Sequence, residues 1–222
     1  MADVTVAGPG PVGATGRSPL PPGWRWVRLG EVVREAQVGF ACGERDPNGV
    51  IQLRMNNVTN RGGFDWSSFI RVPADSGTVA AYQLQPGDVL FNNTNSTELV
   101  GKTALFKSHT EPVVFSNHFT RLRTIHYKLS PQYLDLWLQS QWQQRVFENI
   151  CNRWIGQSAV QRVKLLGLEI PLPPLPEQHR IAAILSGQMA AVEQARKALG
   201  EELEAIDKLP AALLRRAFSG GL

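Results

Sequence analysis

The feature that most restricts the fold is a seven-residue repeat of apolar side chains near the C-terminal end of the chain. Five apolar residues recur with this spacing: Leu185, Val192, Leu199, Ile206 and Leu213. Further apolar residues widen the stripe, namely Ile181, Met189, Ala195, Leu203 and Leu209. A repeat kept in register over this length is typical of a helix that packs along another helix. We therefore expect a long helix whose apolar side needs a helical partner.

The sequence also predicts where this helix begins and where it is interrupted. The segment Pro171–Pro176 (PLPPLP) is expected to be a stiff extended connector, and its last proline, with Glu177, suits the first turn of a helix. Pro210 lacks the N–H group of a helical hydrogen bond, so a break or kink is expected near Leu209. A helix from residue 177 to residue 208 would be about 48 Å long. No second segment could form a helix of this length, so we expect residues 176–222 to dimerise.

Residues 20–175 predict a globular domain of mixed strands and helices. Short apolar runs bounded by turn residues are typical of strands. Such runs are found at residues 89–91, 103–106 and 112–115. In the segment 119–125 polar and apolar residues alternate, which places Arg121 and Arg123 on one face of a strand.

A helix is expected to begin near Ser130, with Pro131 in its first turn. Apolar residues then recur at helical spacing and are expected in the core: Leu134, Trp137, Leu138, Val146 and Ile150. The predicted fold class is therefore α+β, a globular domain of mixed sheet and helix followed by a long C-terminal helix of the coiled-coil type.

The basic residues are concentrated in the globular domain. Residues 20–175 hold 16 Lys and Arg against 12 Asp and Glu, whereas residues 176–222 hold six of each. This excess could face a phosphate backbone. On charge alone, a slightly basic domain without a polyanionic partner is the simpler interpretation.

Several classes of protein are not indicated. Residues 1–19 are rich in Gly, Pro, Ala and Thr and are expected to be a disordered tail, and their G-x-G-x-x-G pattern lacks the strand and helix of a nucleotide site. No apolar stretch approaches the roughly 20 residues that span a bilayer, and Asp3 is untypical of a secretory signal. Cys42 and Cys151 fit no metal or disulfide pattern. We expect a cytoplasmic protein with neither cofactor nor metal.

Four groups of segments resemble the DNA-specificity (S) subunits of type I restriction-modification systems. These segments are LPPGW and LGEV at 20–24 and 29–32, GDVLFN and VGK at 87–92 and 100–102, IPLPPLPEQ with Ile181 at 170–181, and AFSGGL at 217–222. They follow one another in the family's order over some 200 residues. The chain is identified as a half-length member with a single target-recognition domain.

The resemblance implies a non-catalytic protein that reads DNA sequence. In the family, each recognition domain reads half of a bipartite site, and two antiparallel helices set the spacing and dock methyltransferase (M) subunits, with restriction (R) subunits as further possible partners. This chain stops after one repeat. It is therefore expected to pair with a second copy or with another half-subunit, unless it is a fragment of a disrupted gene. A two-fold pair would read inverted half-sites.

Three polar stretches carry side chains that suit contacts with bases and phosphates. The expected DNA contacts are Arg54, Asn56, Asn57 and Arg61; Asn92, Asn93, Asn95, Ser96 and Lys102; and Arg153, Gln157, Ser158, Arg162 and Lys164. The competing interpretation is that Asn-rich segments are turns whose side chains bond the nearby backbone. Arg121 and Arg123 could likewise brace the sheet through carboxylates instead of binding DNA.

Enzymatic interpretations are weaker. Asp88, Glu98 and Lys102 faintly resemble a metal-dependent nuclease set, but three residues separate the glutamate from the lysine where the usual motif has one. A phosphate-binding G-x-x-x-x-G-K-[ST] loop is absent. The alternatives from other classes are a coiled-coil interaction protein and a standalone DNA-binding regulator. Salt dependence separates the first of these from a DNA reader, because only binding to phosphates weakens steeply with salt.

Overall fold

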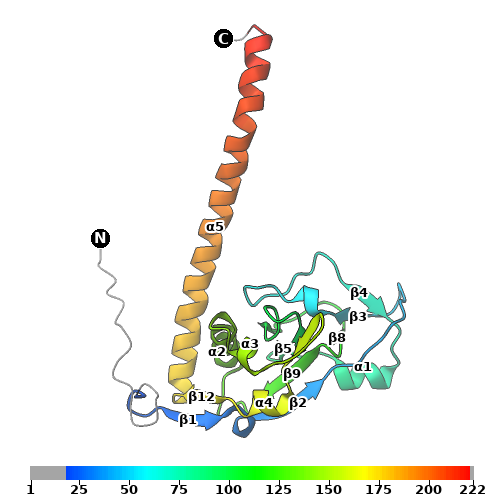
Figure 1. The fold of residues 1–222 in the computed structure, drawn as a ribbon, viewed down its shortest axis with the longest axis vertical. Coiled ribbons are helices and arrows are strands. Elements are labelled where there is room, and N and C mark those ends of the chain that lie inside the picture. Colours follow the sequence, from blue (N-terminus) through cyan, green and yellow to red (C-terminus); the bar gives the residue numbers. More distant parts are fainter. Residues whose placement is uncertain (1–18, 221–222) are drawn as a thin grey trace. The chain divides into compact units, whose positions relative to one another are not determined.

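The computed structural model describes residues 19–220. It divides the chain into a globular unit that ends at His179 and a helical unit that begins at Arg180 (Figure 1). The tail expected at the N-terminus lies, except for Pro19, outside the described residues. The predicted α+β class with a long C-terminal helix is confirmed.

The globular unit is built on four small sheets. The largest has the order β2 (Val33–Val38), β9 (Phe119–Thr124), β5 (Val89–Asn92) and β7 (Thr103–Leu105), with every pair antiparallel. A second sheet has the order β4 (Ile70–Val72), β3 (Val50–Leu53) and β8 (Val113–Phe115), and its β3–β8 pair is parallel. The third is β10 (Asn152–Trp154), β11 (Gln157–Ala159) and β6 (Thr94–Asn95), and the fourth pairs β1 (Arg25–Arg28) with β12 (Glu169–Leu172).

Short helices join and cover these strands. They are α1 (Ser76–Tyr82), α2 (Pro131–Gln143), α3 (Val146–Ile150) and α4 (Arg162–Leu166), with 3₁₀ turns at Leu29–Glu31 and Met55–Asn57. The strands predicted at 89–91, 103–106 and 112–115 are confirmed as β5, β7 and β8. One end of each strand differs from the prediction by one residue.

The main hydrophobic core is formed by both of the larger sheets and the loops beside them. Its buried members are Ile51, Leu53, Val58, Leu84, Leu90, Ala104, Phe106, Val113, Phe115 and Phe119. Phe64, Trp66 and Tyr82 pack against this cluster from its edge. Burial of these side chains is the main favourable contribution to folding, at roughly 1.5–3 kcal/mol for each large aliphatic or aromatic residue.

The helix predicted from Ser130 is two helices. Pro131 lies in the first turn of α2, and Leu134 and Leu138 are fully buried, as predicted. Arg145 then adopts a left-handed conformation (φ 58°), which ends the first helix and restarts the chain as α3. Because this break changes the helical phase, Phe147 is fully buried, whereas Val146 and Ile150, which the single-helix pattern placed in the core, are only partly buried.

The first turn of α5 (Leu175–Phe218) is joined to the globular unit by one buried amide. Gln178 accepts a hydrogen bond from the backbone N–H of Ser130 (2.8 Å) and donates to the carbonyl oxygens of Lys128 and Pro173 (2.9 Å each). Its side chain therefore satisfies three buried backbone groups, which would otherwise each cost about 1–3 kcal/mol.

The helix α5 itself spans 44 residues, about 66 Å. It continues through Pro210 to Phe218, so of the break or kink expected near Leu209 the break is wrong. A proline removes one N–H donor from the helical ladder, and here the hydrogen bonds on both sides keep the helix continuous.

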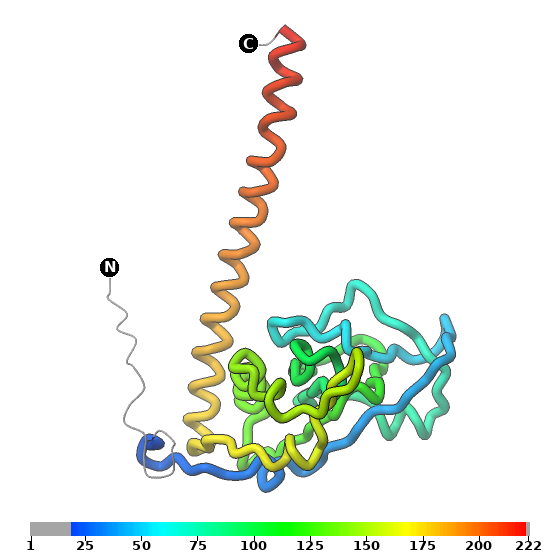
Figure 2. Tube along the Cα trace, viewed as in Figure 1, coloured from blue at the N-terminus to red at the C-terminus, as the bar shows by residue number. Residues whose placement is uncertain are grey.

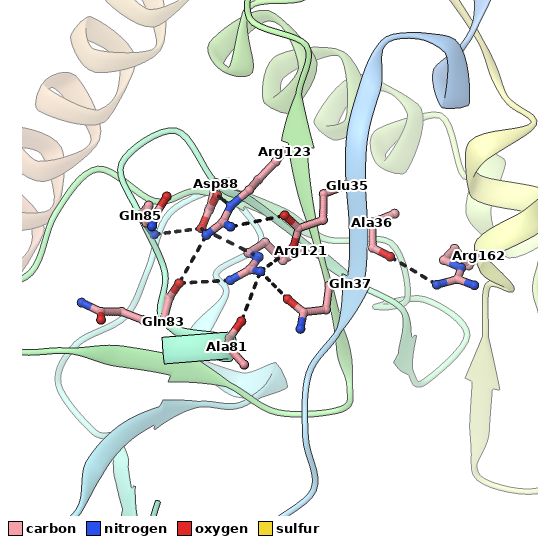
Figure 3. Close-up of polar contacts among 10 residues, drawn as sticks. All are labelled: Glu35, Ala36, Gln37, Ala81, Gln83, Gln85, Asp88, Arg121, Arg123 and Arg162. Carbon is pink, nitrogen blue, oxygen red and sulfur yellow. Dashed lines mark hydrogen bonds and ion pairs between the residues drawn. The ribbon is translucent and has the colours of Figure 1, made fainter. Parts of the chain in front are cut away.

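Two arginines on one face of β9 brace the largest sheet (Figure 3). Arg121 is buried and donates to the carboxylate of Glu35 and to the carbonyl oxygen of Gln83, 3.0 Å away. Arg123 binds Asp88 with two hydrogen bonds, of 2.7 and 3.1 Å. Burial acts to raise the pKa of Glu35, but its hydrogen bonds and charge interactions with both arginines outweigh burial and lower the pKa. The bracing interpretation of these arginines is confirmed.

A single buried carboxyl group lies between α2 and the strand β7. Asp135 accepts a hydrogen bond from Gln139 (2.8 Å), and its other oxygen has no hydrogen-bond partner. Burial raises the pKa of Asp135 to about 7, although its hydrogen bond with Gln139 and the charge of Lys107 act in the opposite direction.

Replacement of this group should change how stability depends on pH. The folded domain keeps Asp135 protonated up to about pH 7, whereas the unfolded chain ionises it near pH 3.8. Stability should therefore fall as pH rises through this interval, by at most about 1.4 kcal/mol per pH unit. Asp135→Asn cannot ionise and should flatten this fall in urea denaturation series from pH 5 to pH 8.

The matched control is Asp65→Asn. Hydrogen bonds from Ser67 lower the pKa of Asp65, so it titrates below this interval and its replacement should leave the pH slope as it is. An unchanged slope in Asp135→Asn would show that Asp135 is not the group responsible.

Candidate nucleic-acid interface

Two of the three polar stretches expected to contact DNA meet in one small sheet. Strand β11 pairs with β6, with Ser158 opposite Asn95 and Ala159 opposite Thr94. The hydroxyl groups of Thr97 and Ser158 lie 2.8 Å apart and add a side-chain bond to this pairing. The sheet thus joins segments that are about 60 residues apart in the sequence.

The first stretch is brought to the same region by the end of β8. The N–H of Ser116 donates to the carbonyl oxygen of Leu53 (3.0 Å), which places Arg54 beside the turn at 116–118. Burial, and then the positive charge of Arg54, lower the pKa of His118. From the other side, Asn92 donates to the carbonyl oxygen of His118 (3.0 Å). This turn therefore links the first stretch to the second.

Five of the predicted contact residues are buried, so their side chains offer little surface for a DNA contact in this structure. They are Asn57, Asn92, Asn93, Lys102 and Ser158. The asparagines instead bond the backbone. Asn57 donates to the carbonyl oxygens of Asp65 and Ser68, and Asn93 donates to that of Asn117. The competing interpretation of Asn-rich segments as self-bonded turns applies to them, because a buried amide must find its partners inside the protein.

Lys102 is likewise buried and bonded to the backbone. Its Nζ donates to the carbonyl oxygen of Val58 at 2.6 Å, and burial lowers its pKa. This bond ties the loop that follows β3 to the residue that precedes β7. Asp88 is bound to Arg123 instead, so the residues of the nuclease-like set are not assembled around a common site.

The other predicted contacts lie at the surface or are partly exposed. They are Arg54, Asn56, Arg61, Asn95, Ser96, Arg153, Gln157, Arg162 and Lys164. Arg153 and Lys164 are ordered by hydrogen bonds of 2.8 Å to the carbonyl oxygens of Glu148 and Ile150. Arg162 donates to the carbonyl oxygen of Ala36 on β2 (3.3 Å), so it covers the edge of the largest sheet (Figure 3).

Four exposed or partly exposed residues of this region are not among the predicted contacts. Asn117 is exposed and His118 partly exposed on the turn that joins the stretches, and Trp154 and Ile155 are exposed at the end of the β10–β11 hairpin. The turn could not be assigned, because its neighbours come from distant segments. The hairpin did leave a signal, since Trp-Ile-Gly interrupts an otherwise polar stretch.

Within residues 19–220, no group of three or more His, Cys, Asp or Glu side chains is placed to hold a metal ion. Both cysteines are free thiols. No helix among the described residues is long and apolar enough to cross a membrane. The chemistry available at this surface is hydrogen bonding by amide and guanidinium groups, together with positive charge.

Comparison with known proteins places these features in a family. The family model of the type I restriction modification DNA specificity domain matches residues 21–204. A Methanocaldococcus jannaschii protein named for the specificity subunit of the type I restriction enzyme MjaX is 32% identical over 144 residues, which cover 65% of this chain and 33% of that protein. The StySPI specificity subunit of Salmonella potsdam is 25% identical over 203 residues, 90% of this chain and 43% of its own length.

A solved structure agrees with these matches. A chain from a study of complex assembly and conformational transition in a type I restriction-modification system has a TM-score of 0.65 and 26% sequence identity, over 92% of this chain and 48% of that one. The present chain thus spans between a third and a half of the length of the relatives it matches.

The buried asparagines provide a test of the scaffold. Asn92→Ala would leave two carbonyl oxygens and the amide of Asn95 without their bonds, so we expect a loss of roughly 1–3 kcal/mol in the free energy of unfolding. The exposed Asn56→Ala should change it by less than about 0.5 kcal/mol. Urea denaturation measures both. Unchanged stability of Asn92→Ala, combined with lost DNA binding, would assign this residue to the DNA instead.

Proposed function

We propose, from the premise that this chain belongs to the family of type I restriction-modification DNA specificity domains, that it recognises a DNA sequence on behalf of partners that carry out the catalysis. The observation that carries the proposal is the family match, which runs without interruption through the globular unit and into α5. The assembly of Arg54, the turn at 116–118 and the β6–β11 sheet supports it, because side chains that suit base and phosphate contacts gather there.

We further propose that the globular unit reads one half of a bipartite site. Of its expected contacts, the surface residues Asn56, Asn95 and Gln157 have side chains that pair with base edges, whereas the guanidinium group of Arg54 suits a phosphate. The positive excess of residues 20–175 would strengthen attachment to the phosphates without selecting sequence.

The helix α5 is proposed to pair with another helix and to dock methyltransferase subunits. Its heptad residues are exposed, from 40% at Leu185 to 65% at Leu199. Exposed apolar residues at seven-residue spacing are costly in water unless a partner covers them. A second copy of this chain is the proposed partner, and it would bring two recognition domains onto inverted half-sites.

Methylome sequencing of the host, with the gene intact and deleted, tests the proposal. Deletion should abolish methylation at one bipartite motif, and an inverted repeat in that motif would support pairing of identical copies. An asymmetric motif would assign the second half-site to a different half-subunit. An unchanged methylome would contradict the proposed role in a methylating complex, and the chain would then be a fragment or a regulator.

Salt dependence separates DNA recognition from a coiled-coil interaction protein. The logarithm of the DNA association constant should fall linearly with the logarithm of salt concentration, and Arg54→Gln should reduce the slope by up to about 0.9 because one phosphate contact is lost. The control is Lys208→Gln. Lys208 lies on the helical unit, which carries none of the proposed DNA contacts, so this variant should have the same salt slope as the wild type. Fluorescence anisotropy at four salt concentrations measures the association constant and hence the salt slope. The absence of salt-dependent DNA binding would favour the interaction protein.

A further inference from the structure

The hairpin formed by β10 and β11 carries two apolar side chains into solvent. It is the yellow-green part of the trace near residue 155 in Figure 2. Its connection is the dipeptide Ile155-Gly156, and Gly156 adopts φ +77°, a conformation that a side chain would strain. Ile155 is fully exposed and Trp154 is 60% exposed. Large apolar side chains at the end of a hairpin lose the burial that normally stabilises them, so a partner for this tip is expected.

The register of the hairpin shows which side chains accompany them. Trp154 is opposite Gln157, and Arg153 is opposite Ser158. Opposite residues share a face, and Ser158 is buried. The face with Trp154 and Gln157 is therefore the outer one. Gln157 is exposed there and offers both a donor and an acceptor, the pattern that pairs with adenine.

Charge around the hairpin favours a polyanion as the partner. Residues 149–168 contain three basic residues, Arg153, Arg162 and Lys164, and no acidic residue. Lys164 donates to Asn152 Oδ1 on β10 (3.1 Å), which fixes its charge at the base of the hairpin. Two carboxylates lie near this region. Glu148, immediately before the segment, forms an ion pair with Arg145 (3.5 Å), and the pKa of Glu98 is lowered first by hydrogen bonds and then by the charges of Arg145 and Arg153.

We propose that the Trp154–Ile155 tip enters a groove of the bound DNA and packs into a base-pair step, while Gln157 reads a neighbouring base edge. This rests on the proposed function. The major groove admits a two-stranded β-ribbon, and proteins that bind the minor groove insert apolar side chains between base pairs to unstack and bend the duplex. An indole ring stacks on any base, so Trp154 supplies affinity and Gln157 supplies sequence preference. The tip would then read the deformability of the step as well as its bases.

Affinity measurements with the full chain test this inference. The wild-type chain is first used to select a binding sequence from a pool of randomised 30-bp duplexes. Trp154→Ala and Ile155→Ala are then measured against the selected duplex by fluorescence anisotropy. We expect Trp154→Ala to weaken binding by about tenfold. The salt slope should not change, since no phosphate contact is lost. The control is Val163→Ala, which shortens an apolar side chain that is 80% exposed on α4. This variant should bind the selected duplex as the wild type does.

A spectroscopic readout distinguishes insertion from a merely structural effect. 2-Aminopurine placed in turn at each step of the selected duplex should brighten at one step when the wild-type chain binds, because unstacking relieves its quenching. Trp154→Ala should abolish this signal, and its unchanged melting temperature would show that the fold is intact.

The outcomes separate this inference from the proposed function. If the wild type selects no sequence, the proposed function itself fails. If it selects one, but both tip variants bind it with wild-type affinity or no step brightens, the inference is wrong and the proposed function stands. Tip variants that bind DNA normally but no longer associate with methyltransferase subunits would also overturn it, and would assign the tip to a protein contact.

Discussion

The buried guanidinium group of Arg121 ties together segments that are more than 80 residues apart. Glu35 on β2, Asp88 at the start of β5 and the backbone after α1 surround it. A buried charge is tolerated only with partners, and removal of one partner from such a group costs about 3–5 kcal/mol. The order of β2, β9 and β5 in the largest sheet therefore depends on this cluster, and so does the turn at 116–118 that leads into β9.

That turn connects the sheet to the surface proposed to contact DNA. Its carbonyl groups accept hydrogen bonds from Asn92 and Asn93, so the polar segment after β5 is anchored from within. The segment in turn pairs with β11, which positions the exposed hairpin. The buried amides are thus a rigid support for a smaller set of exposed side chains. Such support would suit the proposed recognition of bases, which requires placement within a fraction of an ångström.

The two units of the chain present different kinds of surface, which fits the proposed division between DNA recognition and helix pairing. The globular unit presents side chains of many shapes, as recognition of a base sequence requires, whereas α5 presents a regular apolar repeat, as association with a second helix requires. Gln178 belongs to the globular unit and holds the first turn of the helix there, since its amide forms hydrogen bonds with three backbone groups of that unit.

Local patterns in the sequence determined the fold class, the strands around β5, β7 and β8, the start of α2 and the long helix, because each depends on neighbouring residues along the chain. The tertiary structure decided the rest. It buried Lys102 and Asn92, which the sequence presents as ordinary surface residues, because their partners come from distant segments. It also broke the helix at Arg145, where burial of Phe147 sets the new phase. Exposure and contact across the chain are properties of the folded molecule, so a polar stretch in the sequence indicates a binding surface without showing which of its residues face outward.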